Sequence, residues 1–292
     1  MNLRWHLARV IGPLWRLLPP YWRVRAYHHL VGEPFGAAPF GGVHVLRHVA
    51  PHGHVMRLDL GDWMERLAAF IGIFYEIEVT QTIVRLVPPG SDFVDIGGNL
   101  GFTSLIASSC VGDQGRVIYV EPNPALVTRF RDTIQRNAIA NIAIVEAAFG
   151  SAPGTLALAV ARHHGQSQLE SHVDAASASI PVTVIDEASV LPLLTEGQPC
   201  FIKIDVEGFE QIVLAGMSRL LDRPRTCFLI ELTDDWLRRN GGSADELWDV
   251  MMRHGFHGYL PTMSALQRGV RFEPITHAPT VFQSDVLFMR PG

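Results

Sequence analysis

From residue 92 onward, short apolar runs alternate with longer segments in which apolar residues recur at helical spacing. The short runs are typical of buried strands, and the longer segments are typical of helices that cover a sheet. This order of strand and helix predicts an open α/β sheet with crossover helices. The expected strands are residues 93–95, 116–120, 142–145, 200–204 and 227–230, followed by a last pair at 256–260 and 285–289.

The chain before this pattern is organised differently. Residues 33–55 are rich in glycine, proline and histidine and predict a loop, with one strand near residues 43–49. We therefore expect an N-terminal basic helical and loop extension at residues 1–54 and one larger domain at residues 55–292.

The first 32 residues contain five arginines and no acid, with tryptophan and leucine between the arginines. The favoured interpretation is a helix packed on the main domain or on a partner subunit. A basic helix lying on a membrane surface is the alternative that the pattern leaves open.

A glycine turn follows the first strand of the sheet. Asp95 ends that strand, and Gly97, Asn99 and Gly101 give a G-x-N-x-G spacing before an apolar helix at residues 102–111. Such a turn leaves free backbone N–H groups at the sheet edge, where open α/β sheets bind nucleotide-like ligands. The spacing lacks the third glycine of a dinucleotide site, and the acid would repel a pyrophosphate. S-adenosylmethionine, which carries an ammonium and a sulfonium, fits this turn better than NAD.

Acids also follow the next two strands. Glu121 lies 20 residues or more beyond the glycine turn and is placed to bind both ribose hydroxyls of an adenosyl ligand. Glu146 could accept a hydrogen bond from the adenine amine, and Ala147 could cover the ring. An ordinary strand end explains Glu146 and Ala147 equally well.

A further group of ionisable residues ends the strand at 200–204. Asp205 could remove a proton from an attacking hydroxyl, or it could hold a cation that acidifies that hydroxyl. Lys203 lies on the same strand face and needs an acidic partner if it is buried. Asp95, Glu121, Glu146, Asp205 and Glu231 all follow apolar strands, which suggests one shared cleft along the rim of the sheet.

Composition narrows the class of protein. The 292 residues are 48% hydrophobic, with a formal charge of −5 and a pI near 6.2, which argues against a nucleic-acid binder. The three cysteines lie in apolar runs and predict reduced core residues in a cytoplasmic protein. We find no apolar run long enough to span a membrane and no standard zinc spacing, so no metal site is predicted.

Three stretches together resemble the FkbM-type family of S-adenosylmethionine-dependent methyltransferases. They are residues 94–101, 120–124 and 202–210, and the Lys-Ile-Asp-Val-Glu-Gly run at 203–208 is the most specific. The resemblance implies a Rossmann-like class I methyltransferase fold: a mostly parallel seven-stranded sheet, helices on both faces and an antiparallel last strand.

The resemblance also implies O-methylation of a hydroxyl on a sugar, glycolipid or secondary-metabolite acceptor. By this resemblance, the amino-acid end of the cofactor would be held by Asp95, Gly97, Asn99 and Gly101. Its ribose would be held by Glu121. Asp205 and Glu207 lie beside the reaction centre, and Lys203 is included with them as a catalytic candidate. The chain departs from the family at Gly98, where alanine is frequent.

Two other functions stay open at this point. One is an NAD-dependent oxidoreductase, which would share the ribose-binding acid. The other is a non-catalytic protein on the same fold that binds a partner or the inner face of the membrane through residues 1–32. The sequence leaves the formation of a homo-oligomer undecided.

Overall fold

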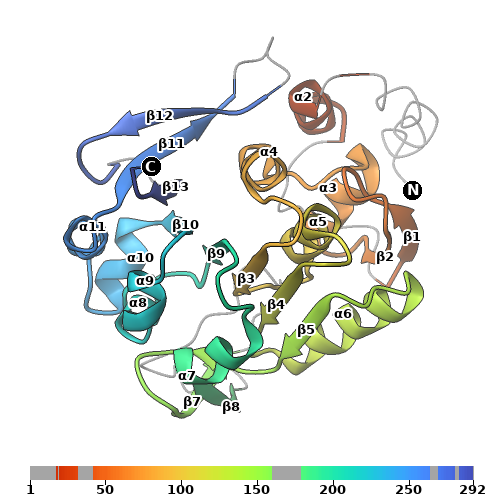
Figure 1. Cartoon of the computed structure of the whole chain (residues 1–292). Helices are drawn as coiled ribbons and strands as arrows, with labels where there is room; N and C mark the ends of the chain where they lie inside the picture. The colour runs from red at the N-terminus through yellow and green to blue at the C-terminus, as the bar shows by residue number, and fades with distance from the viewer. Residues whose placement is uncertain are drawn as a thin grey trace.

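A central sheet organises the molecule. The computed structural model describes residues 18, 20–31, 42–159, 179–263, 269–279 and 283–291. Within these residues the main sheet has eight strands in the order β12-β11-β13-β10-β9-β3-β4-β5 (Figure 1). They are β3 (Asp92–Ile96), β4 (Arg116–Val120), β5 (Ile142–Val145), β9 (Cys200–Ile204), β10 (Thr226–Leu232), β11 (His257–Thr262), β12 (Arg271–Ile275) and β13 (Ser284–Met289).

Strand directions confirm the expected fold class. β5, β4, β3, β9 and β10 run parallel, and β13 lies antiparallel between β10 and β11. The sheet has eight strands rather than the seven expected, because β12 forms a hairpin with β11. The β12 sequence Arg-Phe-Glu-Pro-Ile has no apolar run and contains a proline, which is tolerated because β12 is an edge strand. Because β12 lacks an apolar run, the sequence pattern did not indicate this strand.

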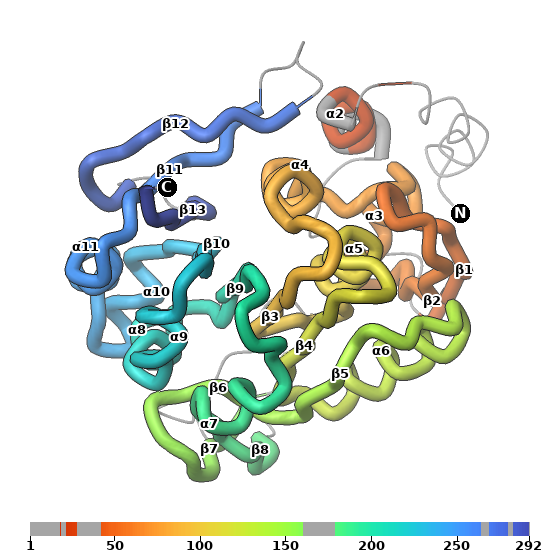
Figure 2. The backbone as a smooth tube through the Cα atoms, viewed as in Figure 1, coloured from red at the N-terminus to blue at the C-terminus, as the bar shows by residue number. Residues whose placement is uncertain are grey.

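Helices cover both faces of this sheet, and each face has its own apolar core. In Figure 2 the yellow and green strands β3, β4 and β5 lie on one side of β9, and the blue strands lie on the other. The order in which successive strands are added to the sheet therefore reverses between β3 and β9. Open α/β sheets bind ligands at such a reversal. One face carries α3 (Trp63–Ile71), α4 (Ile77–Leu86), α5 (Phe102–Val111) and α6 (Pro124–Arg136); the other carries α7 (Glu187–Val190), α8 (Glu210–Ala215), α9 (Ser218–Asp222), α10 (Asp234–Arg239) and α11 (Ala244–Arg253).

Local chemistry explains where several helices begin and end. α6 begins with Asn123, whose side chain accepts from the Ala125 N–H at 3.0 Å, followed by Pro124 in the first turn. The helices α8 and α9 follow one another with a short break between them. The break falls at Gly216, where a Cβ atom would lie 2.0 Å from the Gly150 carbonyl oxygen, so the chain passes too close to a neighbour to continue regularly.

Two small sheets flank the main one. β6 (Ala148–Phe149), β7 (Gly154–Ala159) and β8 (Ser179–Ile185) form a three-stranded sheet. β1 (His44–His48) and β2 (Val55–Asp59) form an antiparallel hairpin. This hairpin crosses residue 54, where the sequence placed the end of the N-terminal extension.

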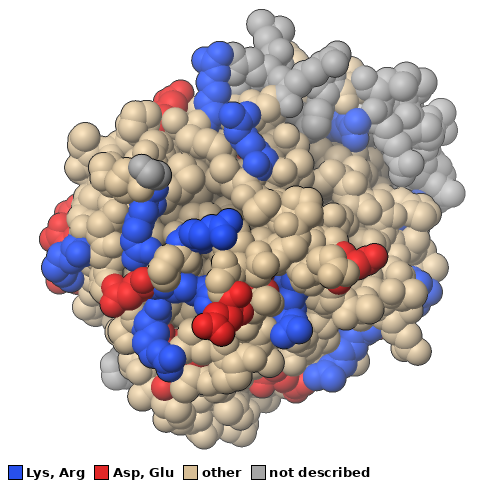
Figure 3. Space-filling model, viewed as in Figure 1, with Lys and Arg blue, Asp and Glu red and all other residues tan. Residues whose placement is uncertain are grey.

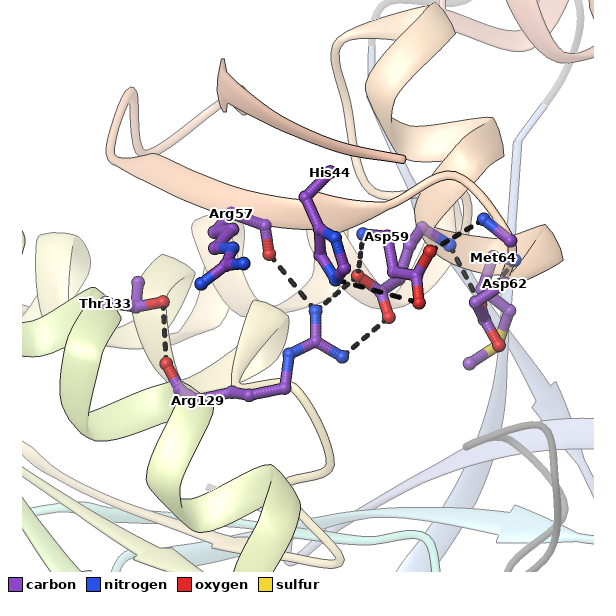
Figure 4. Close-up of polar contacts among 9 residues, drawn as sticks. His44, Arg57, Asp59, Asp62, Met64, Arg129 and Thr133 are labelled. Carbon is purple, nitrogen blue, oxygen red and sulfur yellow. Dashed lines mark hydrogen bonds and ion pairs between the residues drawn. The ribbon is translucent and has the colours of Figure 1, made fainter. Parts of the chain in front are cut away.

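The helix α3 is anchored to the main domain by a buried ion pair. Arg129 of α6 donates two hydrogen bonds to the Glu65 carboxylate, at 2.8 and 2.5 Å, and a third to the Arg57 carbonyl oxygen of β2 (Figure 4). Asp62 caps α3 by accepting from the N–H groups of Met64 and Glu65. These contacts fix the first turn of α3 against the sheet.

The helix α2 (Pro20–Val31) packs on α3, because Tyr27 is buried in an apolar cluster with Leu67 and Ile71. This packing agrees with the favoured interpretation of the N-terminal segment. Residues 1–17 lie outside the described part of the chain, so the membrane interpretation stays a prediction. None of the described helices has the length and apolar character needed to cross a bilayer. On the face shown in Figure 3, acidic and basic side chains are interspersed.

Candidate active site

The glycine turn after β3 is built from left-handed backbone conformations. Gly97 and Gly101 each have φ +81°, and Asn99 between them has φ 49°. The N–H groups of Gly97 and Gly98 both donate to the Val120 carbonyl oxygen, at 3.0 and 3.1 Å, which holds the turn against the end of β4. Residues other than glycine rarely adopt such a conformation, so the sequence dictates the turn.

Close packing adds a second reason for these glycines. A Cβ atom at Gly97 would lie 1.9 Å from the Asp205 carbonyl oxygen, and one at Gly101 would lie 2.0 Å from the Phe130 ring. At Gly98 it would lie 2.3 Å from the Tyr119 ring. An alanine at this position would therefore require Tyr119 to move.

Asp95 and Glu121 hold the turn in place with their side chains. Asp95 Oδ2 accepts from the Thr103 and Ser104 hydroxyls, both at 2.6 Å, which joins β3 to the first turn of α5. Glu121 accepts from the backbone N–H groups of Asn99 and Asn123, both at 2.9 Å. Both carboxyl groups are buried within the fold.

Glu210 stabilises the loop after β9 by accepting hydrogen bonds from backbone groups of that loop. Glu210 Oε1 accepts from the N–H groups of Val206 and Gly208, at 3.2 and 3.0 Å. Gly208 has φ +100°, and a Cβ atom there would lie 2.7 Å from the Trp236 carbonyl oxygen. Glu207 takes the left-handed conformation with φ 51°. The Asp-Val-Glu-Gly-Phe-Glu sequence thus forms a tight loop that presses against α10.

Lys203 and Asp205 form the central ion pair of the site. Lys203 Nζ lies 2.6 Å from Asp205 Oδ2, with the lysine side chain 3% exposed and the aspartate 25% exposed. Burial alone would lower the pKa of Lys203, but the carboxylates of Asp205, Glu76 and Asp95 outweigh it and raise that pKa. The lysine is therefore charged, and it holds the Asp205 carboxylate in one position.

Asp205 and Glu231 are part of a row of carboxyl groups that crosses three strands. Ile204 of β9 pairs with Ile230 of β10, so Asp205 and Glu231 follow side by side, and Glu231 pairs with Asp285 of β13. Gln283 donates from Nε2 to Glu231 Oε1. Burial and the neighbouring acids raise the pKa values of Glu231 and Asp285, which reduces the repulsion within this row.

A cavity of about 400 Å³ lies over this row, which is within the usual size of a small-molecule site. Its lining includes Gly97, Gly98 and Asn99 of the glycine turn, together with Asp205 and Glu231 of the row. Aromatic side chains form the rest of the wall, with Trp63 and Tyr75 in ring contact at 5.5 Å and Phe74 stacked on Phe102 at 4.8 Å. The lining also includes Glu76, Glu207, Trp236 and Gln283.

The structure brings five of the candidate residues to this cavity: Gly97, Asn99, Lys203, Asp205 and Glu207. Gly101 belongs to the turn but does not line the cavity, and Asp95 and Glu121 also lie outside the lining and hold the turn through hydrogen bonds. Ala147 is buried outside the cavity lining. Glu146 is exposed and lies 3.1 Å from Arg131 of α6, so its side chain points to the surface rather than into the cavity.

Several lining residues were absent from the sequence-based candidates. Glu231 was noted only as one acid of the rim, and Glu76 was not among the candidates. Glu76 precedes the first residue of α4 and its side chain makes no capping hydrogen bond; it lines the cavity instead, where it interacts with Tyr75 and Lys203. Trp63, Tyr75 and Trp236 carry no sequence signal of their own, because aromatic residues are equally frequent in cores.

Burial raises the pKa of most acids in and behind the cavity. It raises the pKa of Glu207 to about 9 and that of Glu76 to about 8, with Lys203 opposing the rise at Glu76. The pKa of Glu121 rises to about 7, against the effect of its two backbone hydrogen bonds. The pKa of Asp285 rises to about 6. At neutral pH the site therefore holds protons that ordinary carboxyl groups would have lost.

We expect the ligand-free protein to lose stability as the pH rises from 7 to 9. Glu76 and Glu207 have folded-state pKa values above their unfolded values, so the folded state binds more protons in this window and the slope is negative. The lowered pKa of His52, to about 3, acts in the opposite direction but only at lower pH. Thermal unfolding measured across this pH range checks the sign. A change of about 1 kcal/mol in the free energy of unfolding shifts the melting temperature by about 2–4 °C. A melting temperature that rises toward pH 9 would contradict it.

Comparison with known proteins identifies one family. The family described as "Methyltransferase FkbM domain" matches residues 95–257. Among curated proteins, a probable cobalt-precorrin-6B C(15)-methyltransferase (decarboxylating) from Sulfolobus acidocaldarius is 34% identical over 67 residues. That match spans 23% of this chain and 33% of the relative, so the chain matches about a third of the relative's length.

Three similar solved structures are described as methyltransferases. Methyltransferase FkbM from Methylobacillus flagellatus is 16% identical with a TM-score of 0.43, over 68% of this chain and 44% of that one. Precorrin-6y C5,15-methyltransferase from Geobacter metallireducens is 16% identical with a TM-score of 0.41, over 73% and 88%. A putative methyltransferase from Streptococcus mutans in complex with SAH is 9% identical with a TM-score of 0.41, over 73% and 96%.

Proposed function

The chain belongs to the FkbM-domain methyltransferases, whose methyl donor is S-adenosylmethionine, and on that premise we propose that it methylates a hydroxyl oxygen. The proposed acceptor is a sugar, a glycolipid or a secondary metabolite. The observation that carries the proposal is the Asp205 carboxylate, which is partly exposed in the cavity and held by Lys203 opposite the glycine turn.

The cavity fits this donor. Two lining atoms, Asn99 Oδ1 and Glu207 Oε2, have no hydrogen-bond partner among the described residues, and the amide oxygen of Asn99 is an acceptor. They suit a ligand that donates hydrogen bonds or carries positive charge, as the ammonium, ribose hydroxyls and sulfonium of the donor do. Lys203 is the only basic residue among the described lining residues, and Asp205 occupies it. A pyrophosphate would therefore face carboxylates, which disfavours the NAD-dependent alternative.

In the proposed reaction Asp205 accepts the proton of the acceptor hydroxyl as the oxygen attacks. The bound donor supplies an electrophilic methyl group on a sulfonium. Lys203 keeps the Asp205 carboxylate in one orientation, and a base must lie within about 3 Å of the proton that it removes. The aromatic wall excludes water, so the acceptor oxygen rather than water is aligned for attack.

The experiment uses donor labelled in the methyl group with panels of neutral glycosides, glycolipids and phenols. We expect label in an alkali-stable ether, and Asp205→Asn should lower turnover by about 100-fold or more while donor affinity changes little. Label on carbon or nitrogen would refute O-methylation while leaving a methyltransferase. Equal turnover in the variant would leave Asp205 a structural role. Donor binding without transfer to any acceptor would favour the non-catalytic alternative.

A further inference from the structure

The order of the strands separates the donor from the acceptor. The N–H groups of the glycine turn after β3 donate to the end of β4, which leads to Glu121, so a donor bound at this turn extends toward β4 and β5. β9 and β10 lie on the other side of β3. Asp205 follows β9, and Glu231 lies near the end of β10. The part of the cavity over β9 and β10 is therefore left for the acceptor.

Trp236 of α10, the helix that follows β10, lines the cavity and is half-buried. Its side chain makes no hydrogen bond or ring contact with another described residue. The lining residues Phe74, Tyr75 and Phe102, in contrast, pack their rings on one another. The indole of Trp236 is therefore available to stack on the ring of a bound molecule.

Trp236 is held in a fixed position relative to Asp205. Asn240 donates from Nδ2 to the carbonyl oxygens of Gly208 and Trp236, both at 3.3 Å. A Cβ atom at Gly208 would lie 2.7 Å from the Trp236 carbonyl oxygen, so the two segments are in direct contact. The loop at 205–210 and α10 thus form one block. A ring that stacks on Trp236 consequently has a defined position relative to the Asp205 carboxylate.

Polar side chains surround the same part of the cavity. Gln283 and Glu231 line it and share a hydrogen bond, and Glu207 contributes a buried Oε2 atom with no partner among the described residues. Burial raises the pKa of Glu207 to about 9, and burial with the neighbouring acids raises the pKa of Glu231. Both carboxyl groups therefore hold a proton near neutral pH. A protonated carboxyl group, like an amide, both donates and accepts hydrogen bonds, as hydroxyl groups do.

We propose that Trp236 selects the acceptor by stacking on the apolar face of a neutral pyranose ring. Glu207, Glu231 and Gln283 bind the ring hydroxyls that are not methylated. A pyranose combines a face of C–H bonds, which suits an indole, with hydroxyls around its edge. A phenol or an apolar secondary metabolite would leave the buried polar groups without partners, which weakens binding. This inference rests on the proposed function, because it requires methyl transfer to an oxygen beside Asp205.

The first test compares acceptors on the wild-type full chain with methyl-labelled donor. The acceptors are methyl hexopyranosides, open-chain hexitols, which have the hydroxyls without the ring, and phenols, which have a ring without the other hydroxyls. We expect kcat/KM for a hexopyranoside to exceed the values for hexitols and phenols by about 30-fold or more. Transfer to hexitols or phenols with no preference for hexopyranosides overturns the inference and leaves O-methylation intact. Absence of transfer to any hydroxyl overturns the proposed function and the inference with it.

Variants of α10 assign the preference to Trp236. Trp236→Ala should raise KM for the hexopyranoside by about tenfold, while the Kd of the donor, measured by calorimetry, changes by less than about twofold. Trp236→Phe keeps an aromatic face and should bring KM to within about threefold of wild type. Arg238→Ala is the matched control, because the Arg238 side chain is exposed on the same helix and pairs with Asp234, and it should keep the wild-type KM.

An unchanged KM in Trp236→Ala, or a loss confined to donor affinity, overturns the inference. An equal rise of KM in Arg238→Ala also overturns it, because disturbance of α10 would then explain the effect. If Trp236→Ala does not fold, Trp236→Leu takes its place, since leucine fills the position without an aromatic face, and the same rise in KM is expected.

Discussion

Gly97→Ala is expected to abolish donor binding and to lower the free energy of unfolding by about 2–5 kcal/mol. Two effects add at this position. An alanine at φ +81° takes a left-handed conformation that costs about 1–2 kcal/mol, and its Cβ atom would lie 1.9 Å from the Asp205 carbonyl oxygen. The collision pushes the glycine turn away from β9, so the two sides of the cavity lose their alignment.

Gly90→Ala is the matched control. Gly90 has φ +79° but no atom lies within 4 Å of its Cβ position, so this variant has the backbone strain without the collision. It should lose about 1 kcal/mol of stability and bind the donor normally. Urea unfolding and calorimetric titration of both variants separate the two effects. Donor binding by a folded Gly97→Ala protein within threefold of wild type would refute the role given to the turn.

Lys203→Met is expected to lower the free energy of unfolding by about 3–5 kcal/mol at pH 8, because it leaves buried carboxylates without their positive partner. The loss should shrink at pH 5.5, where Glu76 and Asp285 can bind protons instead. The raised folded-state pKa of Lys203 means that its stabilisation is complete below its unfolded pKa and is lost only in strong alkali. The pH dependence of the variant therefore comes from the acids.

Lys203→Met combined with Asp205→Asn tests the assignment. Removing the nearest carboxylate together with the lysine should recover part of the lost stability, and the difference from additivity measures the coupling of the pair. Urea unfolding of the two single variants and the double variant at pH 8 provides these values. Additive losses would show that the 2.6 Å contact between the two side chains contributes no coupling.

The sequence predicted the glycine turn of the cavity better than the aromatic wall. The glycine turn follows from positions where only small, left-handed residues fit, and this requirement is visible in the residues themselves. The loop at 205–210 is equally local, since Glu210 accepts from backbone groups within four residues. Such features depend on short-range geometry, which sequence patterns record well.

The expectation that five acids share one cleft along the rim of the sheet was only partly correct. Asp205 and Glu231 reach the cavity, but Asp95 and Glu121 are taken up by hydrogen bonds within the turn and Glu146 lies at the surface. The end of a strand determines where a residue lies along the edge of the sheet. It does not determine whether neighbouring groups form hydrogen bonds with the side chain. Glu76 was missed because its place depends on how α4 packs against the sheet, which is a long-range contact.

The cavity draws its wall from stretches on either side of the family match. Trp63, Tyr75 and Glu76 precede residue 95, and Gln283 follows residue 257. The residues that close this part of the cavity therefore lie outside the segment that matches the family model.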